Sequence, residues 1–346
     1  MYLLEWTKFT FKVLKANFSY PRLPFKYFLV VTKSCGSRCT NCLIWKETPN
    51  NELTLEEFKK IAMNAGPNLY WLNISGGEPT DRADLAEIIR IFIDHCPNLT
   101  IVNFTTNGLN LETLSRVATF LDSSRIPIIG INVSIDGPPD VHNKLRGMPD
   151  GFNQAIEAYK MIRNFKRIKS APAMTLFPLN HNKIEETVLS IKKHIPLFDG
   201  SELHLNYPHS SGHYYGNGEI NYSTRVNIDA ITPYLKTHRR NISPMNIVER
   251  IYQKKLLRFL KTNRTPMNCA ALISNIYISE KGDIYPCTIW DKKIGSLRDE
   301  QYDLKRIINS EIAKKTKDEI KQKKCPNCWT PCEAFPSIIT DIKSIL

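Results

Sequence analysis

The sequence of 346 residues has no long hydrophobic run, and its first twenty residues mix apolar side chains with Glu5, Lys8, Lys12 and Lys15. A helix that crosses a membrane needs about 20 mainly apolar residues, and a secretion signal needs an uninterrupted apolar stretch. We therefore expect a cytoplasmic protein without a transmembrane segment. Residues 1–25 are predicted to form an amphipathic extension that packs on the body of the protein or contacts a membrane surface.

Cysteine is scarce as well, with nine residues that fall mainly in two groups. This number and placement exclude a disulfide scaffold and favour metal sites. Acidic residues are fewer than basic ones, 34 against 47, which gives a net charge of +13. Such a charge suits nucleic acid, an anionic membrane surface or an acidic peptide, and it does not choose among them. Because no aromatic-and-basic RNA-binding signature accompanies it, we do not expect a nucleic-acid partner.

What is present is an alternation of apolar strand-like runs with amphipathic helical stretches. Strands are predicted at residues 27–31, 70–74, 100–104, 128–135, 171–177 and 202–206, and helices at residues 54–65, 82–95, 111–121, 152–165 and 183–194. This order predicts an α/β fold, in which a parallel sheet forms an open sheet or a complete or partial barrel under outer helices. Functional side chains are then expected at the carboxyl ends of the strands.

The alternation also suggests domain limits. We expect a core at residues 26–225, a helical connector at residues 226–265 and a small cysteine-rich domain at residues 266–346. Residues 207–218 are rich in glycine and aromatic side chains, and we expect no regular element there.

The first cysteine group, Cys35, Cys39 and Cys42, follows the first predicted strand on a loop. Three thiolates cannot complete a four-iron cluster, since each iron needs a terminal ligand, so one iron is left open to bind a small molecule. A zinc site with a fourth ligand and three buried structural thiols are the competing interpretations.

Glycine-rich and polar motifs follow the next three predicted strands. The second strand ends in a Gly-Gly-Glu-Pro turn, the third in Thr-Thr-Asn-Gly, and the fourth in Ser-Ile-Asp-Gly with a Leu-Arg-Gly sequence after it. Each motif alone is an ordinary turn or surface feature. The residues of interest are Gly76, Gly77, Glu78, Pro79, Asn107, Ser134, Asp136 and Arg146.

Together, the cysteine spacing and the ordered motifs resemble the radical S-adenosylmethionine (radical SAM) superfamily. The resemblance implies a partial (β/α)6 TIM-like barrel and a [4Fe–4S] cluster on the three cysteines, whose open iron binds S-adenosylmethionine beside the motif residues given above. It implies reductive cleavage to a 5′-deoxyadenosyl radical that abstracts hydrogen from a substrate, with flavodoxin or ferredoxin as electron donor. One departure is Asn41, where many members carry an aromatic residue beside the adenine. Leu43, Ile44 or Trp45 could take that packing role.

The second cysteine group lies in the tail. Cys269, Gly282 and Cys287 precede Cys325, Cys328 and Cys332, a pattern that resembles the auxiliary-cluster domain called SPASM or its shorter form, twitch. The resemblance implies one auxiliary [4Fe–4S] cluster on Cys269, Cys287, Cys325 and Cys328, with Cys332 replacing one of them or free nearby. A structural zinc site with four cysteines would show much the same pattern.

The substrate site is the least determined feature. Candidates are His209, His213, Tyr214 and Tyr215, in the segment after the sixth strand, although such residues often only pack. The substrate could be a peptide, a small molecule or a lipid precursor. The alternative class is a non-catalytic zinc or iron–sulfur protein, an electron carrier or a module that binds RNA through its basic surface, and binding of S-adenosylmethionine separates the enzyme from these.

Overall fold

The computed structural model describes residues 23–220, 227–236 and 244–341. The predicted amphipathic extension therefore lies almost entirely outside the described residues, and its contact with a membrane stays a prediction. Among the residues described, no helix is long and apolar enough to cross a membrane.

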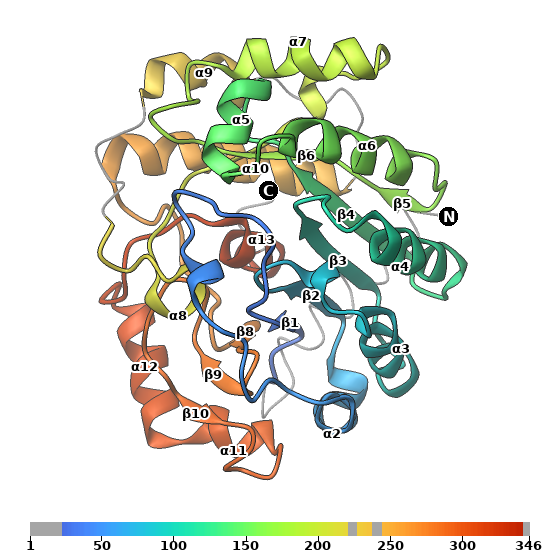
Figure 1. The fold of residues 1–346 in the computed structure, drawn as a ribbon. Helices are drawn as coiled ribbons and strands as arrows, with labels where there is room; N and C mark the ends of the chain where they lie inside the picture. Colours follow the sequence, from blue (N-terminus) through green and yellow to red (C-terminus); the bar gives the residue numbers. More distant parts are fainter. Residues whose placement is uncertain (1–22, 221–226, 237–243, 342–346) are drawn as a thin grey trace.

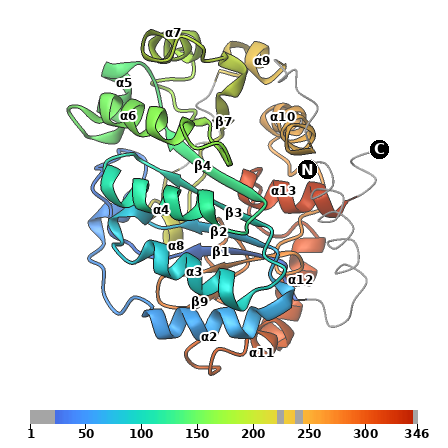
Figure 2. The same cartoon turned by 90° about the vertical axis from the view of Figure 1, so that its right-hand side faces the viewer.

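Six parallel strands form the body of the protein. They pair in the order β1 (Lys26–Val30), β2 (Trp71–Ser75), β3 (Ile101–Thr106), β4 (Ile128–Ser134), β6 (Pro172–Thr175) and β7 (His204–Asn206), while β5 (Ile168–Lys169) adds to β4. The connections carry α2 (Leu55–Ala65), α3 (Leu85–His95), α4 (Leu111–Ser123), α5 (Pro139–Arg146), α6 (Gly151–Arg163) and α7 (Ile184–His194) (Figure 1). Figure 2 shows α2, α3, α4 and α6 layered along the outer face of the sheet. The predicted α/β partial (β/α)6 barrel is confirmed.

The two faces of the strands differ sharply in polarity. On the outer face, Leu72 and Val102 are fully buried in the main apolar core beneath the helices. On the inner face, Asn73, Asn103 and Asn132 line a cavity inside the barrel. Alternation along each strand therefore places apolar side chains against the helices and amide side chains in the lumen. In a complete TIM barrel, by contrast, bulky aliphatic side chains fill the lumen.

One local expectation is wrong. Residues 207–218, expected to hold no regular element, contain the short helix α8 (Gly212–Tyr215). The Ser211 side chain accepts a hydrogen bond from the Tyr214 backbone N–H and so caps the helix, and Gly216 ends it in the left-handed conformation at φ 65°. Capping at both ends allows one helical turn in a segment that its composition marks as loop.

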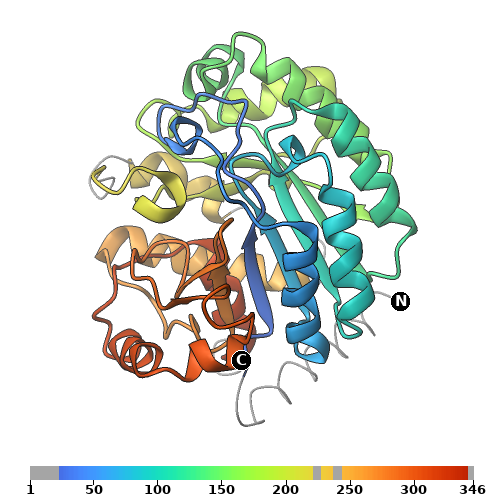
Figure 3. The ribbon, with the colours of Figure 1, turned by 60° about the horizontal axis from the view of Figure 1, so that its bottom comes forward.

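The tail continues the sheet on the far side of β1. Strand β8 (Asn275–Ile278) pairs parallel with β1, and β9 (Asp283–Tyr285) and β10 (Gly295–Ser296) follow antiparallel. Figure 3 shows this orange-to-red region beside the blue β1. The remaining helices are α9 (Ile228–Lys236), α10 (Pro244–Thr262), α11 (Leu304–Asn309), α12 (Glu311–Lys321) and α13 (Pro331–Thr340). The proposed domain limits stay a prediction.

Candidate functional site

All of the first-group cysteines and all eight motif residues line one small cavity. It measures about 170 Å³ and lies at the carboxyl ends of the strands, between the cysteine loop and the turns after β2, β3 and β4. The cysteines form no disulfide. Across the described ranges, no three His, Cys, Asp or Glu side chains are placed to hold a single metal ion. A four-iron cluster takes each thiolate on a different iron, so its ligands stand farther apart than those of one ion.

Glycines let the turns approach the cysteine loop closely. A Cβ on Gly77 would lie 2.1 Å from the Ser34 carbonyl oxygen, and one on Gly147 would lie 2.4 Å from that of Arg38. The loop and the turns also share backbone hydrogen bonds, such as Glu78 N–H to the Ser34 carbonyl at 2.7 Å. Any larger residue at Gly77 or Gly147 would push the cysteine loop away from its neighbours.

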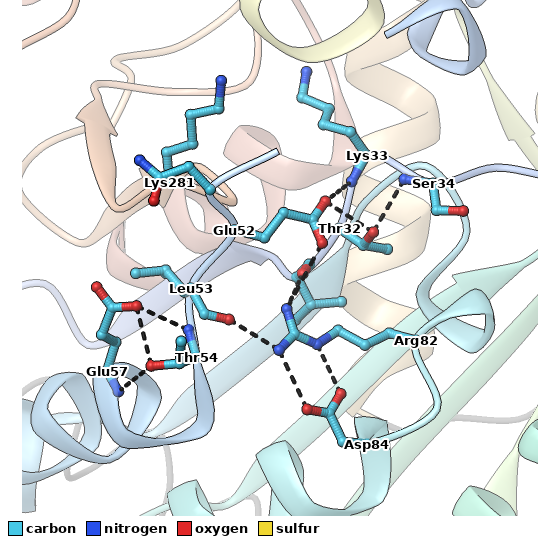
Figure 4. Close-up of polar contacts among 12 residues, drawn as sticks. Thr32, Lys33, Ser34, Glu52, Leu53, Thr54, Glu57, Arg82, Asp84 and Lys281 are labelled. Carbon is cyan, nitrogen blue, oxygen red and sulfur yellow. Dashed lines mark hydrogen bonds and ion pairs between the residues drawn. The ribbon is translucent and has the colours of Figure 1, made fainter. Parts of the chain in front are cut away.

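A polar clamp holds the base of the cysteine loop (Figure 4). The Glu52 carboxylate accepts hydrogen bonds from the Thr32 hydroxyl at 3.0 Å and the Lys33 N–H at 2.7 Å. Arg82 donates to the Val31 carbonyl at 2.8 Å and to the Leu53 carbonyl at 2.9 Å. Sequence reasoning did not identify Glu52 or Arg82, although Arg82 follows the Gly-Gly-Glu-Pro turn by three residues.

The Glu78 carboxylate connects two turns through hydrogen bonds to protein groups. It is buried, and it accepts hydrogen bonds from the Thr80 N–H and hydroxyl, from the Thr106 hydroxyl at 2.7 Å and from the Asn107 N–H at 2.6 Å. Burial raises the pKa of Glu78, and these donors act in the opposite direction. The carboxylate thus ties the turn after β2 to the turn after β3, and both turns line the small cavity.

Arg146 supplies positive charge beside the thiols. Its guanidinium pairs with Asp136 at 2.7 Å and lies 3.9 Å from the Cys39 Sγ. Its Nε is buried and has no hydrogen-bond partner among the described residues. Burial raises the pKa of Cys35 to about 12 and that of Cys42 to about 11. Such thiols become thiolates only when a nearby cation or metal compensates for the loss of water. This donor set fits an iron–sulfur cluster whose ligand carries a carboxylate.

The residues that follow Cys42 are candidates to replace the aromatic residue that many family members carry at the position of Asn41. Ile44 and Trp45 line the small cavity, whereas Leu43 does not. Trp45 donates its indole N–H to the Cys39 carbonyl at 3.2 Å, which fixes the ring against the loop. Ile44 and Trp45 therefore stay the candidates for packing against adenine.

A larger cavity of about 980 Å³ fills the barrel lumen. It shares with the small cavity four residues at or next to the carboxyl ends of the strands, Ser75, Thr105, Ser134 and Thr175. Asn41, Tyr214 and Tyr215 also line both cavities. At its other side it reaches Cys332 and its neighbours at the start of α13. The lumen therefore connects the first cysteine group with the tail.

The substrate-site candidates divide between two environments. His209, Tyr214 and Tyr215 line the lumen. Burial lowers the pKa of His209 to about 4, and the ring accepts a hydrogen bond from the Trp329 N–H. His213 is not part of the lining. Its ring binds Asp291 and the Cys287 carbonyl and stacks on Tyr285 at 4.2 Å, so it connects α8 to the tail.

Cys269, Cys287 and Cys325 lie close enough to Cys328 to influence its thiol, and the ligand set stays a prediction. Burial raises the pKa of Cys328 well above its usual range, and Cys287, Cys269 and Cys325 raise it further. None of these four influences Cys332, whose pKa burial and Glu333 raise to about 12. Cys332 packs instead against Phe28 and Tyr277, and its carbonyl accepts a hydrogen bond from the buried Lys26 at 2.6 Å.

Comparisons with known proteins agree with this architecture. Residues 29–191 match the family model of the radical SAM superfamily, and residues 269–329 match that of an iron–sulfur cluster-binding domain, SPASM. Residues 29–191 therefore form a radical SAM domain, and residues 269–329 form a SPASM domain. The cofactors of the chain are S-adenosylmethionine and [4Fe–4S] clusters.

Individual relatives are distant. GTP 3′,8-cyclase of Sulfurimonas denitrificans is 31% identical over 152 residues, which cover 40% of this chain and 45% of the relative. Mycofactocin maturase of Mycolicibacterium smegmatis is 30% identical over 138 residues, which cover 39% of this chain and 33% of the relative. The matches thus span less than half of either relative. Streptococcus suis SuiB, solved with its precursor peptide SuiA, has a TM-score of 0.60 at 16% identity, over 90% of this chain and 70% of SuiB.

Proposed function

We propose that this enzyme reductively cleaves S-adenosylmethionine in the small cavity and uses the resulting radical to abstract hydrogen from a substrate in the barrel lumen. The observation that carries the proposal is the continuity of the two cavities through Ser75, Thr105, Ser134 and Thr175. A radical formed at the strand ends reaches a substrate without crossing bulk water, which would compete as a reactant.

The first cysteine group and its neighbours hold the cofactors in this proposal. Cys35, Cys39 and Cys42 are the cluster ligands, and the bound cluster supplies the electron that cleaves the sulfonium. The backbone of Gly76 and Gly77, in the turn that Pro79 closes, would hold the amino acid part of S-adenosylmethionine. Arg146 and Asp136 provide the charged pair next to it, and Ser134 and Asn107 provide polar contacts at the same strand ends.

The tail holds an auxiliary cluster on Cys269, Cys287, Cys325 and Cys328. Cys287 and Cys328 are buried, and Cys269 and Cys325 are half-buried. Four thiolates supply one terminal ligand to each of four irons, so this site would be closed. We propose that this cluster takes up or relays the electron released when the substrate is oxidised. A flavodoxin or ferredoxin is the proposed donor to the first cluster.

For the substrate we propose a peptide segment or a small polar molecule. Amide side chains on three neighbouring strands line the lumen, and they suit hydrogen-bonding groups better than a lipid tail. SuiB binds a precursor peptide and mycofactocin maturase is a maturase, which supports the peptide. His209, Tyr214 and Tyr215 stay candidates for contact with it. His213 is the weakest candidate because its ring is engaged elsewhere.

The test is anaerobic reconstitution with iron and sulfide, reduction with dithionite and chromatography of the S-adenosylmethionine products. We expect 5′-deoxyadenosine and methionine from the wild-type chain and from Cys96→Ala, a matched control whose thiol is buried against the Ala62 carbonyl, outside both cavities. A chain that binds iron fully and forms no 5′-deoxyadenosine would contradict the proposal.

A further inference from the structure

The lumen contains a histidine–carboxylate pair that the reaction described so far does not use. His204 begins β7, and its Nδ1 lies 2.8 Å from Glu249 Oε1 on α10. Both residues line the lumen, and their side chains are only 12% and 13% exposed. The Gln253 side chain donates to the same carboxylate oxygen at 2.9 Å, and the His204 ring stacks on Tyr252. The imidazole is therefore held in one orientation by a hydrogen bond and by packing.

The chemistry of the pair fixes the role of each ring nitrogen. An ionised carboxylate only accepts hydrogen bonds, so Nδ1 of His204 is the donor to Glu249. In the neutral ring Nε2 is then the acceptor, and no described residue is bonded to it. A carboxylate behind one nitrogen fixes the tautomer and the orientation of the ring, as it does for histidines that act as bases or metal ligands.

A second acceptor stands beside it. Asn206 lies two residues farther along β7, on the same face of the strand, and lines the lumen as well. Its Oδ1 is buried and has no hydrogen-bond partner in the part of the chain that the structure describes. Asn206 pairs in register with Thr175, which borders both cavities. The wall formed by β7 thus presents two acceptors, one of them next to the small cavity, and each can receive an O–H or N–H donor.

We propose that His204, oriented by Glu249, is the proton acceptor of the lumen, for a substrate that carries an O–H or N–H group on the carbon that loses hydrogen. The inference rests on the proposed function, and it states which chemical group the substrate of this site must carry. The carbon first loses a hydrogen atom to the deoxyadenosyl radical, and a cluster held by the tail cysteines would accept the one electron that the oxidation releases. The O–H or N–H bond breaks, its proton moves to Nε2 of His204, and a C=O or C=N bond forms.

The first experiment measures whether Nε2 is free and reachable. The full-length, reconstituted chain is treated with diethyl pyrocarbonate, and each of its eight histidines is followed by peptide mass spectrometry. The exposed His194 is the positive control, and His142, which is 2% exposed and accepts the Asp136 N–H, is the negative control. We expect His204 to be modified, several-fold faster than His142. Modification no faster than that of His142 would show that the His204 ring has only a structural role and would overturn the proposal.

The second experiment determines which ring nitrogen of His204 carries the proton. Histidine-labelled ¹⁵N spectra of the same protein, with the His204 signals assigned by their loss in His204→Gln, should show a protonated Nδ1 and an unprotonated Nε2. Glu249→Gln should remove this tautomer preference. A protonated Nε2 in the wild-type chain overturns the proposal. Both readouts are separate from S-adenosylmethionine cleavage, so a wild-type chain without 5′-deoxyadenosine refutes the proposed function, whereas an unreactive His204 refutes only this assignment.

Discussion

The two cysteine groups of this protein use the same ligand chemistry in opposite surroundings. The first group provides three thiols on a loop, borders a cavity of about 170 Å³ and lies against the Arg146 guanidinium. The tail group provides four thiols in a packed region, where Glu333 is the charged neighbour. The Arg146 guanidinium and the open space mark the first group as a site that binds a ligand carrying a carboxylate. The tail group has the features of a site that is coordinatively closed.

The same contrast extends to the way each group is held in place. Glycine contacts and the clamp of Glu52 and Arg82 hold the loop of the first group, so its position depends on turns from three strands. The tail group is held by burial and by Glu333, which accepts hydrogen bonds from Thr288 at 3.0 Å and from Thr330. Disruption of the first group should therefore affect catalysis, and disruption of the second should affect iron content and electron transfer.

The largest expected effect comes from the first group itself. Cys39→Ala should abolish 5′-deoxyadenosine formation, because a cluster held by two thiolates does not present its open iron correctly. Product is measured by chromatography after dithionite reduction, with Cys96→Ala as the control for loss of a buried thiol. Retained cleavage in Cys39→Ala would refute the assignment of the first group.

The charged pair beside that group should have the next largest effect. Arg146→Met is expected to slow S-adenosylmethionine cleavage by about 10- to 100-fold, the usual loss when a residue that supports metal ligands is removed. Iron content should stay near the wild-type value. Because the change leaves Asp136 buried and unpaired, a double variant, Arg146→Met with Asp136→Asn, controls for misfolding. A wild-type rate in both variants would show that the charge near Cys39 is incidental.

The tail group should respond differently to the same kind of change. Cys287→Ala should lower bound iron by about half, since one of two four-iron clusters is lost, and should leave part of the cleavage activity. Iron and zinc are counted by plasma emission on the purified protein. Unchanged iron would favour zinc or free thiols in the tail over an auxiliary cluster.

A smaller effect is expected at the contact between tail and barrel. Arg298 binds Glu57 at 2.6 Å and lowers the pKa of Glu57 to about 2. Arg298→Met should lower the free energy of unfolding by about 1 kcal/mol, the scale of a partly exposed charged hydrogen bond. A lowered carboxyl pKa stabilises the fold above the ordinary carboxyl range, and that stability is lost as the pH falls through this range toward about 2.

The difference between Arg298→Met and the wild-type chain should therefore be constant from about pH 6 to pH 8 in denaturant titrations. Arg306→Met, at a more exposed ion pair in the same region, is the control and should change stability less. A difference that varies across this pH range would contradict the assigned role of Glu57.

The smallest effect should come from the fifth tail cysteine. Cys332→Ser should leave iron content unchanged, because Cys332 lies against the lumen and apart from the other four thiols. Cys325→Ser is the matched variant and should lose iron as Cys287→Ala does. Equal losses in the two serine variants would place Cys332 among the ligands.

Much of this arrangement can be predicted from the sequence, for a physical reason. Parallel strands bring their carboxyl ends to one edge, so motifs that follow successive strands, such as the Gly76–Gly77 turn and Asp136, must meet there. The alternation of apolar residues likewise places the helices on the outer face. These inferences use only local pattern and one rule of topology.

The rest depends on contacts between residues that are distant in sequence. His204 and Glu249 are 45 positions apart, and no motif joins them. The pairing of β8 with β1 and the position of Lys26 under Cys332 follow from packing of the tail, which local propensity does not encode. The α8 helix was missed because its composition favours a loop and only its caps favour a helix.

The most direct test of the difference between the two cysteine groups is electron paramagnetic resonance of the reduced protein with and without S-adenosylmethionine. The account predicts about eight irons per chain and two overlapping cluster signals, of which only the signal lost in Cys39→Ala shifts when S-adenosylmethionine is added. The signal lost in Cys287→Ala should not move. A single signal, or a shift of the Cys287-dependent signal instead, would contradict the assignment of an open first site and a closed tail site.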